Sequence, residues 1–204
     1  MSKPLFTGAC TALVTPFLDG VVNYPMMEQL LRRQIDAGIR AVVICGTTGE
    51  APTLSDDEKL ELFRRAKEYV GSDCLIIAGT GCNCTSHAAE LSLAAENVGV
   101  DALLIVSPYY NKATPEGLVA HYLTIAHTVS IPIIAYNVPG RTGVDIPISA
   151  CRRISPIPNV IGIKEASNDI SKITKLCKDC KDFTVWTTVT SSLYAGTTMV
   201  IGTK

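Results

Sequence analysis

The sequence predicts an α/β protein built as a parallel β/α barrel. Short apolar runs rich in β-branched residues recur without polar alternation, which is typical of strands buried on both faces of a parallel sheet. Comparable points in successive runs are 33, 28, 30 and 27 residues apart, enough for a strand, a helix and two loops. The runs are Ala41–Cys45, Cys74–Ala78, Ala102–Val106, Ile131–Tyr136 and Val160–Ile163.

The segments between these runs carry helix signals. Tyr24–Ala37 follows Asn23 as a cap and has Pro25 in its first turn. Ser55-Asp-Asp-Glu58 is a capping box that opens a helix running to about Val70. The other expected helices are Thr85–Val98, Pro115–Thr128 with Thr114 as its cap, and Asp169–Cys177, while Gly38 and Gly99 stand at helix ends that favour positive φ.

Polar residues whose side chains can catalyse reactions or bind ligands follow several different predicted strands. A barrel gathers the carboxyl ends of its strands around one mouth, where its active site forms. The alternative is an open doubly wound sheet that binds a nucleotide, and such a sheet carries a glycine fingerprint after a strand. The nearest candidate, Gly79-Thr-Gly81-Cys-Asn-Cys84, has a cysteine in place of the third glycine, and no phosphate-binding loop ends in Gly-Lys-Ser/Thr. We therefore favour the barrel.

The composition is that of one globular domain spanning residues 1–204. Hydrophobic residues make up 47% of the chain and charged residues 18%, which excludes a disordered protein. The net charge of −1 favours neither nucleic acid nor a membrane surface as a partner. Residues 1–9 lack the apolar run of a secretory signal, and no apolar stretch approaches the ~18 residues of a membrane helix. We therefore expect a cytoplasmic protein.

The eight cysteines are scattered, and several lie within apolar runs, which favours buried thiols in a reducing compartment. Cys177-Lys-Asp-Cys180 has the spacing of half a zinc site, but no second pair of that spacing lies near it. Cys82-Asn-Cys84 is a weaker candidate. The histidines have no ligand spacing, so we expect no metal; they are His87, His121 and His127.

Lys164 closes an apolar run and is the first candidate for catalysis. An ammonium group at the end of a buried strand is costly unless it is paired or neutral. Desolvation lowers the pKa of a lysine and yields a nucleophilic amine, which condenses with a keto group to an iminium and so stabilises a neighbouring carbanion. The alternative is a structural ion pair with Glu165, although strand alternation turns the two side chains to opposite faces.

Three further clusters follow other strands. In Tyr136-Asn-Val-Pro-Gly-Arg141-Thr142 the tyrosine can move protons and the arginine fork fits a carboxylate; the alternative is a buried tyrosine beside a surface arginine. Gly46-Thr47-Thr48-Gly49-Glu50 offers hydroxyls and backbone N–H groups to a small carboxylate, but alone it reads as an ordinary turn. Ser107-Pro-Tyr109-Tyr110-Asn111-Lys112 presents two aromatic residues for a subunit contact or a proton relay.

These four clusters, in this order, resemble the dihydrodipicolinate synthase and N-acetylneuraminate lyase family. The likeness runs from about Thr7 to Val185, and the combination of GTTGE, SPYYNK, YNVPGRTG and GIKEAS is specific although each motif alone is not. Thr47-Thr48 and Arg141 resemble the synthases rather than the sialic acid lyases. The resemblance implies a (β/α)8 TIM barrel and a Schiff-base (class I) aldolase-type lyase. Such a lyase condenses pyruvate with aspartate semialdehyde to 4-hydroxy-tetrahydrodipicolinate in lysine and diaminopimelate biosynthesis, without a metal or organic cofactor.

The resemblance also implies roles for single residues. Lys164 forms the Schiff base with pyruvate, and Tyr136 donates and accepts protons beside it. Thr47 links Tyr136 to Tyr110, which in the family is lent by the neighbouring subunit of a tight dimer, so we expect self-association into a dimer or tetramer. The expected substrate-binding residues are Thr48 and Gly46 for pyruvate and Arg141 for the carboxylate of aspartate semialdehyde.

Feedback by lysine is expected to be weak. Inhibited relatives bind lysine at the dimer interface through an asparagine and a glutamate after the third strand. Asn83 matches the asparagine, but His87 stands at the glutamate position. A pocket for a cationic amino group binds it poorly once the carboxylate is lost.

The resemblance decays after Trp186, and the chain diverges from about residue 187. A complete barrel of this kind takes about 250 residues, and the family adds a helical C-terminal domain. With 204 residues, the chain is expected to lack that domain and the last barrel helix. Thr187–Ser192 replaces a glycine-rich turn of the family, and Met199–Gly202 is a candidate remnant of the eighth strand. We expect an exposed apolar flank and reduced stability.

Two alternatives remain beside the synthase. One is another pyruvate aldolase of the same family with a different aldehyde acceptor, which Arg141 disfavours because a sugar-type acceptor does not need a carboxylate clamp there. The other is a non-catalytic remnant that binds partner subunits, which the shortened end favours and the intact lysine and tyrosines disfavour.

Overall fold

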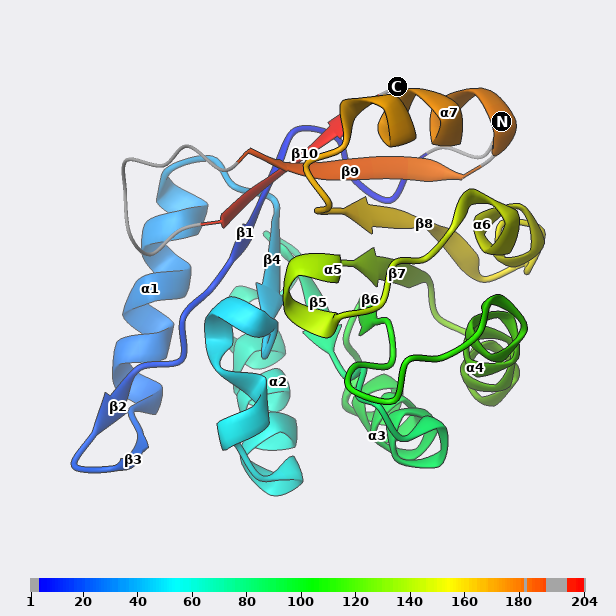
Figure 1. Ribbon diagram of the computed structural model, residues 1–204. Coiled ribbons are helices and arrows are strands. Elements are labelled where there is room, and N and C mark those ends of the chain that lie inside the picture. The colour runs from blue at the N-terminus through cyan, green and yellow to red at the C-terminus, as the bar shows by residue number, and fades with distance from the viewer. Residues whose placement is uncertain (1–3, 182, 190–197, 204) are drawn as a thin grey trace.

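The computed structural model describes residues 4–181, 183–189 and 198–203 and forms a closed eight-stranded barrel (Figure 1). Hydrogen-bonded neighbours follow the order β1-β10-β9-β8-β7-β6-β5-β4, and β4 pairs with β1 to close the ring. The predicted α/β barrel is therefore confirmed. Its strands are β1 (Ala9–Ala12), β4 (Ala41–Ile44), β5 (Leu75–Gly79), β6 (Ala102–Val106), β7 (Ile133–Asn137), β8 (Val160–Glu165), β9 (Thr184–Val189) and β10 (Thr198–Thr203).

Seven strands are mutually parallel and the eighth runs the other way. The pairs from β1 through β4 to β9 are all parallel, whereas β10 is antiparallel to both β1 and β9. A parallel return needs a crossover connection of a dozen or more residues. Only residues 190–197 join β9 to β10, so the connection suits a hairpin. The predicted eighth strand at Met199–Gly202 thus exists, but its direction differs from that of a fully parallel barrel.

The longer helices lie outside the barrel, as Figure 1 shows. Short pieces complete the chain: a hairpin of β2 (Phe17–Leu18) and β3 (Val21–Val22), the turns η1 (Thr47–Gly49) and η2 (Ala51–Thr53), and α5 (Pro139–Thr142). The outer helices are α1 (Tyr24–Asp36), α2 (Asp56–Val70), α3 (Thr85–Val98), α4 (Pro115–Thr128), α6 (Ile148–Ile154) and α7 (Ile170–Asp179).

The predicted caps fix where these helices begin. The Asn23 side chain accepts the Met26 N–H, and Ser55 and Glu58 form the expected reciprocal capping box. Each such cap stabilises its helix by about 1 kcal/mol because it satisfies a backbone donor that has no partner inside the helix. Gly38 and Gly99 have φ of +83° and +92°, as the helix ends predicted.

The core has an inner and an outer layer. Side chains that alternate along the strands from β4 to β8 fill the barrel interior on one face and meet the helices on the other. Leu62 and Phe63 of α2 are completely buried in the outer layer, each contributing about 1.5–3 kcal/mol. In the inner layer Trp186 stacks on Phe6, with ring centroids 5.2 Å apart.

The strand carrying Lys164 is held unusually close to its neighbour. A Cβ atom at Gly162 would collide with the carbonyl oxygen of Thr184 and with the ring of Trp186. Only glycine fits there, two residues before Lys164. The registers of β8 with its two neighbours pair Lys164 with Tyr136 on β7 and with Trp186 on β9. Within the described residues, no helix is both long and apolar enough to cross a lipid bilayer.

Candidate active site

Lys164 lies at the end of β8 with only 4% of its surface exposed. Its Nζ sits 4.4 Å from the centroid of the Tyr136 ring on the neighbouring strand. Burial lowers the pKa of Lys164 from 10.5 to about 8, with the nearby Cys10 opposing the change and Arg141 adding to it. At pH 7 roughly one tenth of the amine is then neutral, against less than one thousandth for an ordinary lysine. The site therefore supplies a nucleophilic amine near neutral pH.

The ion pair between Lys164 and Glu165, which was the structural alternative, does not form. Glu165 points to the helix side of the sheet, as strand alternation predicted, and is 1% exposed. Its carboxylate accepts hydrogen bonds from Asn137 Nδ2 at 3.0 Å and the Ser167 N–H at 2.8 Å, and lies 3.4 Å from Lys172 Nζ. Lys172, not Lys164, is its cationic partner.

Tyr136 and Thr47 meet at the mouth of the barrel. Burial raises the pKa of the Tyr136 hydroxyl, while a hydrogen bond with the Thr47 side chain and the positive charge of Arg141 oppose that change. Tyr136 is therefore a neutral phenol whose oxygen is already oriented by Thr47. Thr47 is held there because η1 turns the chain sharply at the end of β4, after Cys45 in a left-handed conformation with φ of +53°. Such a backbone is costly for a residue other than glycine and is typical of functional sites.

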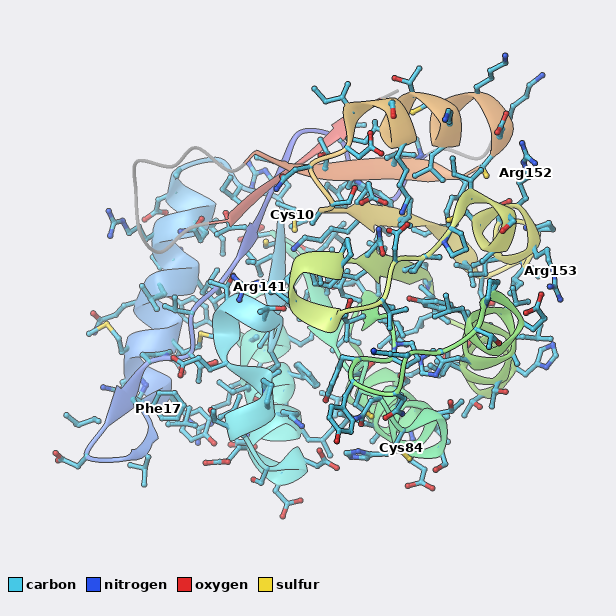
Figure 2. All side chains as sticks on the ribbon, viewed as in Figure 1. Cys10, Phe17, Cys84, Arg141, Arg152 and Arg153 are labelled. Atoms are coloured by element: carbon cyan, nitrogen blue, oxygen red, sulfur yellow. The ribbon has the colours of Figure 1, made fainter. Side chains whose placement is uncertain are left out.

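A cavity of about 420 Å³ brings most of the predicted residues together. Figure 2 shows Arg141, which belongs to α5, at this end of the barrel. The volume suits a small organic acid, and the lining combines an amine, a phenol, hydroxyls and a guanidinium group. Six of the seven predicted site residues line it: Gly46, Thr47, Thr48, Tyr136, Arg141 and Lys164.

Tyr110 is the predicted residue that this chain does not bring to the cavity. It is 87% exposed, and its backbone N–H donates to the Thr142 carbonyl oxygen at 3.3 Å. Its φ of +71° is strained for a bulky side chain, so the loop holds the ring outward at an energetic cost. Within the described residues, the expected proton relay through Thr47 therefore includes Tyr136 of the same chain but not its Tyr110.

Three lining or neighbouring residues escaped the sequence prediction. Asn168 lines the cavity with φ of +63°, a conformation that asparagine tolerates, four residues after Lys164. The signal that could have identified Asn168 from the sequence is that it is a polar residue shortly after a predicted strand. Ala12 lines the cavity from β1, whose sequence carries no such signal. Cys10 lies on the same strand (Figure 2) and faces the barrel interior near Lys164; burial raises its pKa to about 12, so it is a neutral thiol.

A second cavity of about 680 Å³ adjoins the first and shares Thr47, Tyr136 and Arg141 with it. Asn83 and His87, on which the expectation of weak lysine feedback rests, both line it. His87 Nε2 lies 2.6 Å from Asp56 Oδ2, so this histidine is already paired with a carboxylate.

All eight cysteines are free thiols, five of them buried. His121 is 3% exposed and burial lowers its pKa to about 4, as befits a core histidine. In the part of the chain that the structure describes, no group of three or more histidine, cysteine or acidic residues converges as a metal site.

Comparison with known proteins gives a consistent result. A family model described as the dihydrodipicolinate synthetase family matches residues 5–203. The 4-hydroxy-tetrahydrodipicolinate synthases of Acetivibrio thermocellus and Thermotoga neapolitana are 47% and 46% identical over 174 and 187 residues, covering 85% and 89% of this chain. These alignments cover 60% and 64% of the relatives, so the chain spans about three fifths of their length.

Solved structures agree. Dihydrodipicolinate synthase from Aquifex aeolicus superposes with a TM-score of 0.88 at 38% identity, covering 89% of this chain and 63% of that one. The chloride-inhibited enzyme from Acinetobacter baumannii, complexed with pyruvate, gives 0.87 at 43% identity with the same coverage.

Proposed function

The chain belongs to the dihydrodipicolinate synthetase family, and from this premise we propose that it carries the site of a pyruvate-dependent, Schiff-base-forming aldolase-type lyase. The proposed reaction condenses pyruvate with aspartate semialdehyde to 4-hydroxy-tetrahydrodipicolinate, a step toward lysine and diaminopimelate. The single observation that carries the proposal is Lys164: it is buried at the cavity mouth, its pKa is lowered to about 8, and it faces Tyr136.

The proposed chemistry uses side chains alone. The neutral Lys164 amine attacks the keto carbon of pyruvate, and loss of water gives an iminium. The iminium acidifies the methyl group, and an enamine forms as Tyr136, oriented by Thr47, moves protons beside it. The enamine carbon attacks the aldehyde, and the amino group of the acceptor then displaces Lys164 and closes the ring. Thr48 and the Gly46 turn are proposed to hold the pyruvate carboxylate.

Two observations bear on the alternatives. Arg141 on the cavity wall supports an acceptor with a carboxylate over a sugar-type acceptor. The outward, strained Tyr110 supports self-association, because in the proposed relay this ring completes the site of a second copy. The other candidate is a catalytically impaired remnant, which the presence of Lys164 and Tyr136 at one cavity disfavours.

Borohydride reduction in the presence of pyruvate tests the proposal. A pyruvate-dependent adduct mapped to Lys164 by peptide mass spectrometry is the expected result, followed by turnover when aspartate semialdehyde is added. A chain that is folded by circular dichroism yet unlabelled, or labelled diffusely over many lysines, would favour the remnant.

Arg141→Gln is expected to weaken use of aspartate semialdehyde. Losing one charge-assisted interaction with a carboxylate costs about 1.5–3 kcal/mol, so KM for the semialdehyde should rise roughly 10- to 100-fold. Pyruvate labelling of Lys164 should survive. The matched control is Arg153→Gln on α6, an exposed arginine 3.8 Å from Glu116, which should leave KM unchanged. Equal losses of labelling and turnover in Arg141→Gln would contradict a role confined to the acceptor.

Lysine is expected to bind weakly or not at all. His87 replaces the carboxylate that would pair with the lysine ammonium, and it is already bonded to Asp56. Titration calorimetry with lysine should give little heat for the unmodified chain. The back-substitution His87→Glu should increase the affinity. Submillimolar binding to the unmodified chain would refute this expectation.

A further inference from the structure

The second cavity holds a set of reactive groups that the proposed aldolase chemistry does not use. Cys82 lines this cavity, with its Sγ 3.6 Å from His87 Nδ1. The opposite nitrogen of that ring, Nε2, lies 2.6 Å from Asp56 Oδ2. The imidazole of His87 on α3 therefore contacts the Cys82 thiol, in the loop after β5, through one nitrogen. Through its other nitrogen it contacts the Asp56 carboxylate on α2.

The carboxylate determines what the imidazole can do for the thiol. The hydrogen bond with His87 lowers the pKa of the Asp56 carboxyl, so that group is an acceptor at neutral pH. It therefore places the ring proton on Nε2 and leaves Nδ1 with a lone pair facing Cys82. His87 is consequently oriented as a base toward the Cys82 thiol.

A second thiol lies two residues away. Cys84 is exposed at the start of α3 (Figure 2), and its Sγ lies 3.3 Å from Ser86 Oγ. That hydrogen bond, and then the backbone N–H of His87, lower the pKa of Cys84, whereas burial raises the pKa of Cys82. Cys84 is thus the thiol that ionises first, and Cys82 is the thiol that needs a base.

The chain between the two cysteines permits a disulfide. Residues two apart have Cα atoms at most about 7 Å apart, and the chain bends at Asn83, which shortens that distance. Disulfides span Cα separations of about 4.4–6.8 Å. Cys82 Sγ already lies 3.1 Å from the Cys84 carbonyl oxygen.

We propose that Cys82 and Cys84, served by His87 and Asp56, form a redox-active dithiol that a small hydroperoxide oxidises to a disulfide. The Cys84 thiolate attacks the peroxide, the O–O bond breaks, and Cys84 becomes a sulfenic acid while an alcohol or water leaves. His87 takes the proton of Cys82, whose sulfur attacks Cys84. The S–O bond breaks, and hydroxide leaves as water with the proton from His87. Overall, two thiols and one hydroperoxide give a disulfide, an alcohol or water, and one water.

The disulfide has a route to the aldolase site. The Asn83 carbonyl oxygen, between the two cysteines, accepts a hydrogen bond from Asn111 Nδ2 at 3.1 Å. Asn111 follows Tyr110, so the dithiol segment is tied to the loop that presents this exposed tyrosine. Closing the disulfide should move Asn83 and loosen that loop.

Titration with hydrogen peroxide tests the proposal without depending on aldolase activity. After alkylation of the remaining thiols, peptide mass spectrometry should find a loss of two hydrogens confined to the peptide containing Cys82 and Cys84, reversible by dithiothreitol. The chain contains its own control in Cys177 and Cys180, an exposed and a buried thiol three residues apart on and just after α7. We expect this pair to oxidise at least 10-fold more slowly.

Two variants separate the steps. Cys82→Ser should leave a sulfenic acid on Cys84 that dimedone captures, because the resolving thiol is gone. His87→Asn should keep both thiols but slow disulfide closure by about 100-fold, the usual contribution of a general base, so that dimedone again labels Cys84. Oxidation of Cys177 as fast as Cys84, or unchanged closure in His87→Asn, would overturn the proposal.

Discussion

Lys164→Met is expected to abolish pyruvate-dependent borohydride labelling and turnover together. The iminium needs an amine nitrogen at this position, and methionine keeps the length and apolar stem of the side chain without that amine. Labelling in the unmodified chain should rise with pH up to about 8 and then level off, since only the neutral amine reacts and the pKa of Lys164 is lowered to about 8.

The same substitution should stabilise the fold. A lysine whose pKa falls from 10.5 to about 8 on burial destabilises the folded state by roughly 3 kcal/mol at pH below 8, where both states are protonated. That penalty fades as pH rises from 8 to 10.5 and is gone above it, because both states are then neutral. Lys164→Met should therefore unfold at higher denaturant than the unmodified chain at pH 7, with the two converging near pH 10.5.

A matched control distinguishes this outcome from a general effect of removing a lysine. Lys178 is exposed on α7, so Lys178→Met should change neither labelling nor stability. A loss of stability in Lys164→Met would mean that the ammonium group is paired or solvated in the folded chain. A gain in stability with loss of labelling is the signature of a residue kept for chemistry at the expense of the fold.

The sequence predicted best those elements whose signals are local. The bounds of α3 and α4 were predicted to the residue, with one clear local signal at each helix. α3 ends before Gly99, which adopts positive φ, and α4 begins at Pro115 after Thr114, whose side chain caps the helix. The apolar run at Ala102–Val106 likewise matched β6. The sequence also predicted that Glu165 lies on the opposite face of β8 from Lys164, because neighbouring side chains of a strand alternate strictly between its two faces.

Other parts depend on contacts that no local pattern records. β1 and β9 were not predicted, since Ala9–Ala12 and Thr184–Val189 mix threonines with apolar residues and are held as strands by their neighbours. The helix α6 was not predicted either, because it has only seven residues and no side-chain cap marks its start. The direction of β10 follows from the length of the connection before it. The approach of His87 to Cys82 and Asp56 needs the packing of α2 beside α3, which spacing in the sequence cannot reveal.

Lys172→Met is expected to cause the largest loss of folding stability among the substitutions proposed for this chain. Lys172 on α7 is 7% exposed and forms ion pairs with Asp145 and, at 3.4 Å, with Glu165, whose side chain is fully buried. Asn137 Nδ2 bridges the same two carboxylates, at 2.8 Å from Asp145 and 3.0 Å from Glu165. Removing the cation leaves a buried carboxylate without a counter-charge, which typically costs 3–5 kcal/mol.

Urea unfolding of a double-mutant cycle tests this reasoning. Lys172→Met alone should lose about 3 kcal/mol or more, whereas adding Glu165→Gln should recover much of it, because the uncompensated charge is then gone. The matched control is Arg152→Met on α6 (Figure 2), whose ion pair with Asp179 is exposed, and it should cost less than about 1 kcal/mol. Equal losses at Lys172 and Arg152 would mean that water reaches Glu165. A recovered double variant would show that the buried charge anchors α7 and the Asp145 loop to the end of the strand that carries Lys164.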